Sequence, residues 1–310
     1  MVRLGFHDCV GGCDGCVDLL NPANNGLEVI ITALESVVAS FAKDNVTRTD
    51  IWCLAANVYA DFAQGEQRTT FPFKYYGRPT CETLNTVCRN STGQEVPCTP
   101  TRGPHRVLPS PDLDTRGVLE YFQNTFGFDT QETVAILGAH TLGQVERENS
   151  GFVGQAWDGN RGLLDNEYYI QLVGGESADD PVSVLVESAP DWTRLAVDNS
   201  DLPDMPNRFQ WELHSHVMLN ADMALVRNFT GQIDSNGNVS CAFRSPNACP
   251  AAVQTLGHAA VYRNNNQLWL EDFRDVFEIM LNYPFITGSG CPGINLCYIA
   301  TLPTVAARRG

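Results

Sequence analysis

Two histidines in this chain stand in sequence contexts that suit catalysis at a metal centre. The first is in residues 3–9, which read RLGFHDC and place Arg3 four residues before His7. On a helix this spacing projects both side chains from the same face. A cation and a neutral imidazole directed at one point suit the cleavage of a polarised bond such as O–O. Residues 3–9 therefore predict one wall of a reaction site.

The second histidine, His140, comes near the end of an apolar helical run and is followed by Thr141. Residues 137–143 read LGAHTLG. A histidine at such a position suits a buried axial ligand of a metal cofactor. Together the two segments predict a metal cofactor with one histidine on each side.

The two motifs together resemble the distal and proximal histidine motifs of the plant-type haem peroxidase superfamily. The resemblance covers nearly the whole chain in family order. It implies a mainly α fold in which two helical halves sandwich a b-type haem, with long loops pinned by disulfides. We expect one domain over residues 1–310, with a distal half of about 1–128 and a proximal half of about 129–310. The N-terminus is expected to be incomplete, because related peroxidases place another helix upstream.

On the distal side, the resemblance assigns roles to several residues. His7 would move a proton from the inner to the outer oxygen of H2O2, and Arg3 would stabilise the charge that develops. Asn24 matches the residue that accepts a hydrogen bond from the histidine ring, although a helix N-cap is the alternative for it. Phe6 and Pro109 match residues that line the haem.

On the proximal side, the resemblance makes His140 the haem iron ligand and Asp222 the acceptor for its other ring nitrogen. Residues 147–157 resemble the branch of ascorbate and cytochrome c peroxidases, which places a tryptophan beside the proximal histidine. This predicts contact of Trp157 with His140 and a position close to Asp222 that would let the carboxylate accept the indole N–H. Trp157 would be either redox-active or a residue that only fills volume.

The resemblance also implies cation sites. On the proximal side the ligands would be Thr141, Asp158, Asn160, the Leu163 carbonyl and Asp165. Two carboxylates with neutral oxygens favour Ca2+ over K+. A helix-capping acidic loop is the alternative for this segment.

A distal Ca2+ site would use Asp8, the Gly12 carbonyl and Asp14. Here the usual serine ligand is replaced by Cys16, and the loop is one residue shorter than in secretory plant enzymes. The distal site is therefore the weaker of the two predictions.

The composition of the chain excludes some classes of partner and indicates a cellular compartment. The formal net charge is −16, which argues against binding to nucleic acid. No run of eighteen apolar residues exists, so no transmembrane span is predicted. Four N-glycosylation sequons begin at Asn45, Asn90, Asn228 and Asn238.

The eleven cysteines, in sequence rich in loop-forming residues, indicate a disulfide framework. A zinc site is not favoured, because only one Cys-x-x-Cys pair is present. With the sequons, the cysteines predict a secreted protein. The cysteines are Cys9, Cys13, Cys16, Cys53, Cys81, Cys88, Cys98, Cys241, Cys249, Cys291 and Cys297.

Helical periodicity dominates the rest of the sequence. It predicts helices over residues 26–43, over 134–145 and over about 269–281. A further helix is expected after a cap at Thr49, and a capping box at 129–132 precedes the helix over 134–145. Residues 71–111 are predicted to be a long disulfide-pinned loop region, and 230–266 a turn-rich insertion. Few strands are expected.

The predicted function is that of a secreted peroxidase that reduces H2O2 to water through a ferryl compound I. It would oxidise small organic donors, with phenols and protein tyrosines favoured. The mixture of features suggests a hybrid, with an ascorbate-peroxidase-like proximal sequence and secretory-type cysteines. The alternative is an extracellular matrix or adhesion protein that keeps the fold with little turnover.

Overall fold

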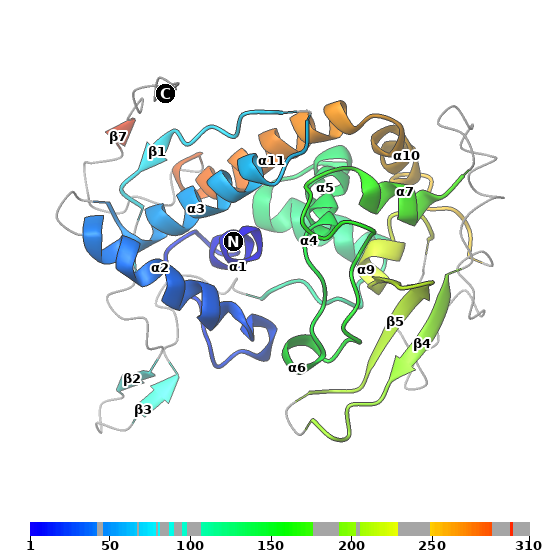
Figure 1. Ribbon diagram of the computed structural model, residues 1–310, viewed down its shortest axis with the longest axis horizontal. Helices are drawn as coiled ribbons and strands as arrows, with labels where there is room; N and C mark the ends of the chain where they lie inside the picture. Colours follow the sequence, from blue (N-terminus) through cyan, green and yellow to red (C-terminus); the bar gives the residue numbers. More distant parts are fainter. Residues whose placement is uncertain are drawn as a thin grey trace.

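The computed structural model of the chain, shown in Figure 1, is dominated by helices, as predicted. The structure describes residues 1–41, 46–66, 68–78, 80, 87–89, 95–97, 107–175, 192–202, 205–228, 249–286 and 298–299. Within this part of the chain, no helix is long and apolar enough to cross a membrane.

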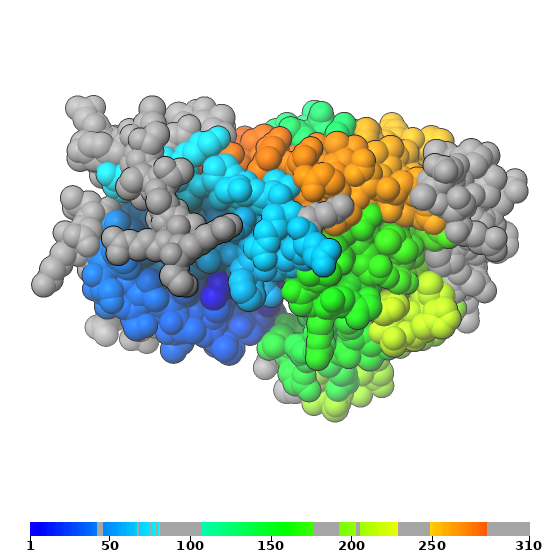
Figure 2. Space-filling model, turned by 45° about the horizontal axis from the view of Figure 1, so that its top comes forward, coloured from blue at the N-terminus to red at the C-terminus, as the bar shows by residue number. Residues whose placement is uncertain are grey.

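The helices fall into two groups along the chain. The first group is α1 (Val2–Cys9), α2 (Leu27–Phe41), α3 (Arg48–Phe62) and α4 (Thr115–Phe126), with the 3-10 helix η1 (Pro22–Asn24). The second group is α5 (Thr130–Leu137), the 3-10 helix η2 (Gly138–Thr141), α6 (Arg147–Ser150), α7 (Glu167–Val173), α9 (Asn220–Met223), α10 (Leu256–Asn264) and α11 (Asn266–Ile286). Figure 2 shows the blue and cyan N-terminal segments on one side of this face, the green ones on the other, and the orange C-terminal helices above them.

The first helix, α1, packs closely against α3 and α11 because it carries a glycine at the crossing. A Cβ atom at Gly5 would lie 2.9 Å from the Ala56 side chain and 3.4 Å from that of Leu281. The first contact is shorter than carbon atoms allow, so any larger residue would push α1 away from α3. In Figure 1, α1 consequently lies in the middle of the molecule, beside α3 and α11.

A buried ion pair connects the same helices. Arg78 Nη1 lies 2.9 Å from Asp50 Oδ1, and both side chains are almost completely shielded from solvent. The guanidinium also donates hydrogen bonds to the Leu281 carbonyl and to Asn282 on α11. Because Asp50 belongs to α3, Arg78 ties α3 to α11.

The helix predicted over 26–43 corresponds to α2, and the one predicted over about 269–281 is the longer α11. The predicted boundaries are wrong in two other places. The cap of α3 is Thr47, not Thr49, because Thr47 and Asp50 form a reciprocal capping box. The helix predicted over 134–145 is two shorter elements: α5 starts at the predicted Asp129–Glu132 capping box, and the chain turns into η2 after Leu137.

The described strands are short and contribute little to the fold, as predicted. β4 (Thr193–Val197), β5 (Arg208–Leu213) and β6 (His216–Met218) form an antiparallel sheet, which Figure 1 shows beside α9. The other described strands are the pairs β1 (Tyr75–Tyr76) with β7 (Tyr298–Ile299) and β2 (Val87–Arg89) with β3 (Glu95–Pro97).

The turn-rich insertion predicted over 230–266 was wrong at its end. Residues 256–264 form α10, which buries Leu256, Ala259 and Tyr262 and packs against α7, where the Tyr262 ring lies 5.4 Å from that of Tyr169. Its apolar spacing was obscured by the polar residues that alternate with the buried ones.

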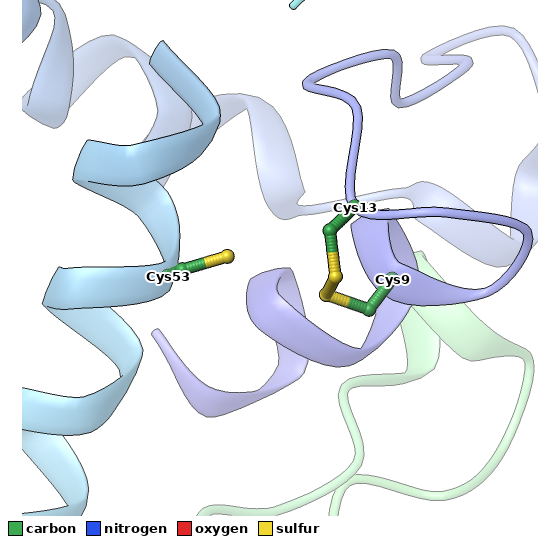
Figure 3. A group of neighbouring side chains, drawn as sticks. All are labelled: Cys9, Cys13 and Cys53. Carbon is green, nitrogen blue, oxygen red and sulfur yellow. A yellow bond between two sulfur atoms is a disulfide. The ribbon is translucent and has the colours of Figure 1, made fainter. Parts of the chain in front are cut away.

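The cysteines confirm part of the expected disulfide framework. Cys9, at the end of α1, is bonded to Cys13, and Cys16 and Cys249 are disulfide-bonded as well. Cys53 is a free, fully buried thiol on α3 that points at the Cys9–Cys13 bond (Figure 3), and the three sulfur atoms lie within 4.8 Å of one another. Burial raises the pKa of the Cys53 thiol to about 12, so it stays protonated at neutral pH.

Candidate active site

A cavity of about 500 Å³ lies between the two groups of helices and contains both predicted histidines in its lining. Residues from α1 and α4 form one wall, and residues from η2, α6 and the segment after His140 form the other. Most of the lining is apolar and includes the predicted haem contacts Phe6 and Pro109. A cavity of this kind suits a flat, largely apolar ligand with polar groups at few points.

On the distal wall, the orientation of His7 is fixed through Asn24. His7 Nδ1 lies 2.7 Å from Asn24 Oδ1, and Asn24 Nδ2 donates to the Asp18 carbonyl at 2.8 Å. The second bond fixes the amide so that its oxygen faces the imidazole. His7 must therefore carry its proton on Nδ1, which leaves the lone pair of Nε2 available as a proton acceptor. Asn24 is the last residue of η1, whose N-cap is Asn21, and the following helix α2 begins only at Leu27, so Asn24 is the N-cap of neither helix.

His7 also stays neutral over a wide pH range. Burial lowers the pKa of the imidazole to about 4, with the positive charge of Arg3 acting in the same direction. The Asn24 hydrogen bond opposes this shift only in part. His7 is therefore a free base at neutral pH, as general-base catalysis requires.

Arg3 lies on the same face of α1 as His7, and backbone carbonyls hold its side chain. Its guanidinium donates to the carbonyls of Asn25 at 3.0 Å and Ala23 at 2.8 Å. Both carbonyls belong to the segment that also carries Asn24, so one short loop positions both distal side chains. The predicted distal group of Arg3, His7 and Asn24 is thus assembled in one place.

On the proximal wall, Asp222 of α9 fixes the ring of His140. His140 Nδ1 lies 2.8 Å from Asp222 Oδ1, and the carboxylate is completely buried. The His140 side chain is 32% exposed and lines the cavity, and its Nε2 has no partner among the described residues. This arrangement leaves Nε2 as the ring nitrogen that can ligate a metal in the cavity.

Tyr168 is a proximal residue that the sequence analysis missed. Its hydroxyl donates to Asp222 Oδ1 at 2.9 Å, and the other oxygen of Asp222 accepts the backbone N–H of Leu219 at 2.7 Å. Both oxygens of the carboxylate are therefore occupied. Nothing in a single sequence relates Tyr168 to a carboxylate 54 residues away.

Trp157 packs face to face on His140, as predicted. The ring centroids are 4.2 Å apart and the planes differ by 4°. The hydrogen bond considered between the indole N–H and Asp222 is not formed: among the described residues, Asp222 accepts from His140, Tyr168 and Leu219. The buried indole ring of Trp157 therefore limits movement of the His140 imidazole on that face.

The residues predicted to bind the proximal cation lie close together beside His140. The Thr141 hydroxyl lies 2.5 Å from Asp158 Oδ2 and 3.3 Å from Asp165 Oδ1. Burial raises the pKa of the Asp158 carboxyl to about 6 and also raises that of Asp165. Two partly desolvated carboxylates and a hydroxyl are a donor set that fits a hard cation.

The remaining predicted cation ligands differ in their exposure and contacts. Asn160 is exposed, and its backbone N–H donates to Asp158, while Leu163 is half-buried in the same loop. On the distal side, Asp8 is buried and Asp14 half-buried, and both carboxylates accept the backbone N–H of Cys16. Gly12 has a φ of 145° in the loop between them.

Comparison with known proteins identifies the family. A sequence model of the family described as peroxidase matches residues 1–232, three quarters of the chain. The chain therefore belongs to the peroxidase family. With its helical fold, this places it in the plant-type haem peroxidase superfamily, as the two histidine motifs predicted.

Three relatives of this peroxidase illustrate how distant the similarity is. A Candida albicans protein named as a heme-binding peroxidase is 24% identical over 241 residues, 74% of this chain and 68% of that protein. A Yarrowia lipolytica protein of the same name is 29% identical over 187 residues, which cover 56% of this chain and 55% of the relative. Cytosolic L-ascorbate peroxidase 1 of Oryza sativa is 27% identical over 188 residues, covering 57% of this chain and 65% of the relative. This peroxidase therefore spans roughly half to two thirds of the length of these relatives.

Proposed function

We propose that this chain is an H2O2-dependent haem peroxidase that oxidises small organic donors. The observation that carries the proposal is the pair of histidines on opposite walls of one cavity, each with its Nδ1 fixed by a side-chain acceptor. The residues fit a haem, because the cavity is mostly apolar and only His140 presents a ring nitrogen oriented by a buried carboxylate. When bound, haem supplies a redox-active iron at which peroxide is reduced and donors are oxidised.

The protein's own contribution is to hold the ligand and to move one proton. His140 would hold the iron through Nε2, and Asp222 would increase the basicity of that ligand by accepting its Nδ1–H. His7 Nε2 takes a proton from H2O2 and returns it to the leaving oxygen. Arg3 stabilises the negative charge that develops on that oxygen.

Haem loading and donor turnover test this proposal directly. Haem-loaded protein should show a Soret band that changes on addition of H2O2, and a screen with guaiacol, tyrosine, ascorbate and Mn2+ should show fastest turnover with the phenols. A protein that binds no haem under these conditions would contradict the proposal. Bound haem without peroxide turnover would instead favour the matrix or adhesion protein.

We also propose that the protein is secreted and N-glycosylated. The disulfide between Cys9 and Cys13 and the four sequons support this, whereas several relatives are named as cytosolic enzymes. The sequons at Asn45, Asn90 and Asn238 lie outside the described residues, and Asn228 is half-buried. Expression in a secreting eukaryotic host should give medium protein whose mass falls on enzymatic deglycosylation.

A Ca2+ ion bound by Asp158, Asp165 and Thr141 completes the proposal. The cation would offset the repulsion between the two carboxylates, to which Glu167 adds a further negative charge. The distal Ca2+ site at Asp8, Gly12 and Asp14 stays a prediction.

A further inference from the structure

Arg208, in the cavity wall, has no carboxylate partner among the described residues. Arg208 is the first residue of β5, is half-buried, and lines the cavity on the side of α6. Its Nε donates to the Ser150 carbonyl at 3.3 Å, and its guanidinium lies 5.2 Å from the centre of the Phe152 ring. These two contacts hold the guanidinium at the wall.

The rest of the guanidinium is available to a ligand. Within the described part of the chain, neither terminal nitrogen of Arg208 has a hydrogen-bond acceptor, and no carboxylate forms an ion pair with it. Burial raises the pKa of the Asp112 carboxyl, and the positive charge of Arg208 lowers it in part. The two groups do not form an ion pair. An arginine presents its terminal N–H groups in a geometry that matches a carboxylate.

Neighbouring polar groups do not neutralise Arg208. Glu146, which lines the same wall, accepts a hydrogen bond from Gln144, and Gln144 in turn accepts one from Arg161. Asn149 also lines this wall, and its side-chain amide has no hydrogen-bond partner among the described residues. Asn149 directly precedes Ser150, whose carbonyl accepts from Arg208, so the two residues offer a charged and a neutral donor group to the same cavity.

We propose that Arg208, assisted by Asn149, binds a carboxylate that enters the cavity. The inference rests on the proposed function, under which the carboxylate has two sources: a propionate of the haem, or an anionic organic donor. The first source would make Arg208 a binding residue for the cofactor. The second would make it a determinant of donor specificity.

Haem release distinguishes these sources without relying on activity. Wild-type protein, Arg208→Met and Arg208→Lys would be loaded with haem or with haem whose propionates are methyl esters, and release to excess apomyoglobin would be followed. If Arg208 binds a propionate, Arg208→Met loses a charged hydrogen bond and should release haem on the order of tenfold faster than the wild-type protein, or more. It should release the methyl ester as fast as the wild-type protein releases that ester. Arg208→Lys, which keeps the charge, should show a smaller effect.

Arg147→Met is the matched control, because Arg147 lies outside the cavity lining and is paired with Asp201. It should leave both release rates unchanged. If Arg208 instead binds the donor, release should be unchanged in Arg208→Met, while KM should rise several-fold for 4-hydroxybenzoate and stay constant for guaiacol.

Three outcomes would overturn either the carboxylate assignment or the proposed function. Unchanged release together with unchanged KM values would overturn the carboxylate assignment and leave the proposed function intact. Equal acceleration for haem and its ester would also overturn it, because that result would show a packing role over Phe152. Failure of the wild-type protein to take up haem would overturn the proposed function, and with it the reason for placing a carboxylate at Arg208.

Discussion

At the scale of single residues, the proposed reaction depends on the protonation state of His7. Its spacing from Arg3 is visible in the sequence, but the low pKa arises from burial and from the nearby guanidinium. The hydrogen bond to Asn24 then decides which nitrogen carries the remaining proton. The same residue on an exposed helix would be half protonated near pH 6.5 and would lack a fixed tautomer.

Replacement of His7 by alanine tests its role as a base. His7→Ala should leave haem bound, because His140 is untouched, and should slow the peroxide-induced change in Soret absorption by about 10²–10⁴-fold. Stopped-flow spectroscopy at a fixed H2O2 concentration measures this rate. Arg3→Leu should slow it less. A His7→Ala protein that reacts at the wild-type rate would show that the distal assignment is wrong.

The pH dependence of the same rate follows from the lowered pKa of His7. The active form is the neutral imidazole, so the rate constant should be flat between about pH 8 and 5 and should fall as the pH decreases through about 4. An exposed histidine would instead lose activity near pH 6.5. A midpoint near 6.5 in the haem-loaded enzyme would contradict the buried, Arg3-influenced site.

At the scale of elements, the end of α5 determines the proximal geometry. The chain changes from α-helix to 3-10 helix at Gly138, where a Cβ would lie 2.5 Å from the Tyr169 hydroxyl and 2.6 Å from the indole nitrogen of Trp269. Only glycine fits between these buried rings. The tight turn then places His140 at the cavity and Thr141, the next residue, beside Asp158.

Removal of the proximal cation should therefore affect the iron ligand as well as the loop. Prolonged chelation should lower Tm, because the carboxylates of Asp158 and Asp165 would again repel each other, and should change the iron spin state through Thr141. Differential scanning calorimetry and absorption spectra would follow both effects, and Ca2+ should restore them. Metal analysis that finds neither Ca2+ nor K+ in active protein would remove this site.

At the scale of the whole molecule, a few buried polar contacts between distant segments hold the cavity walls in place. Arg78 joins α3 to α11 through Asp50, Leu281 and Asn282. The partners lie up to 204 residues apart in the chain. Because α1 packs on both helices, this network also supports the helix that carries His7.

Loss of Arg78 should destabilise the fold without touching the cavity. Arg78→Met would leave the buried Asp50 carboxylate without its cation, and removal of one partner of a buried pair costs about 3–5 kcal/mol. The free energy of unfolding from urea denaturation measures the effect. The control is Arg116→Met, whose partner Glu120 is exposed, and which should change that free energy by about 1 kcal/mol or less. Equal effects of the two substitutions would show that Arg78 has no special role.

The sequence by itself determined the chemistry of this protein, because local spacing carries it. Arg3 and His7 share a helix face, the Asp129–Glu132 box starts α5, and family motifs mark His140, Asp158 and Asp222. Only the tertiary structure decided what those groups face. The occupation of Asp222 by Tyr168, the open guanidinium of Arg208 and the sheet β4–β6 all depend on contacts between segments distant in the chain. Such contacts form when apolar faces pack, and a single sequence gives the faces without saying which of them meet.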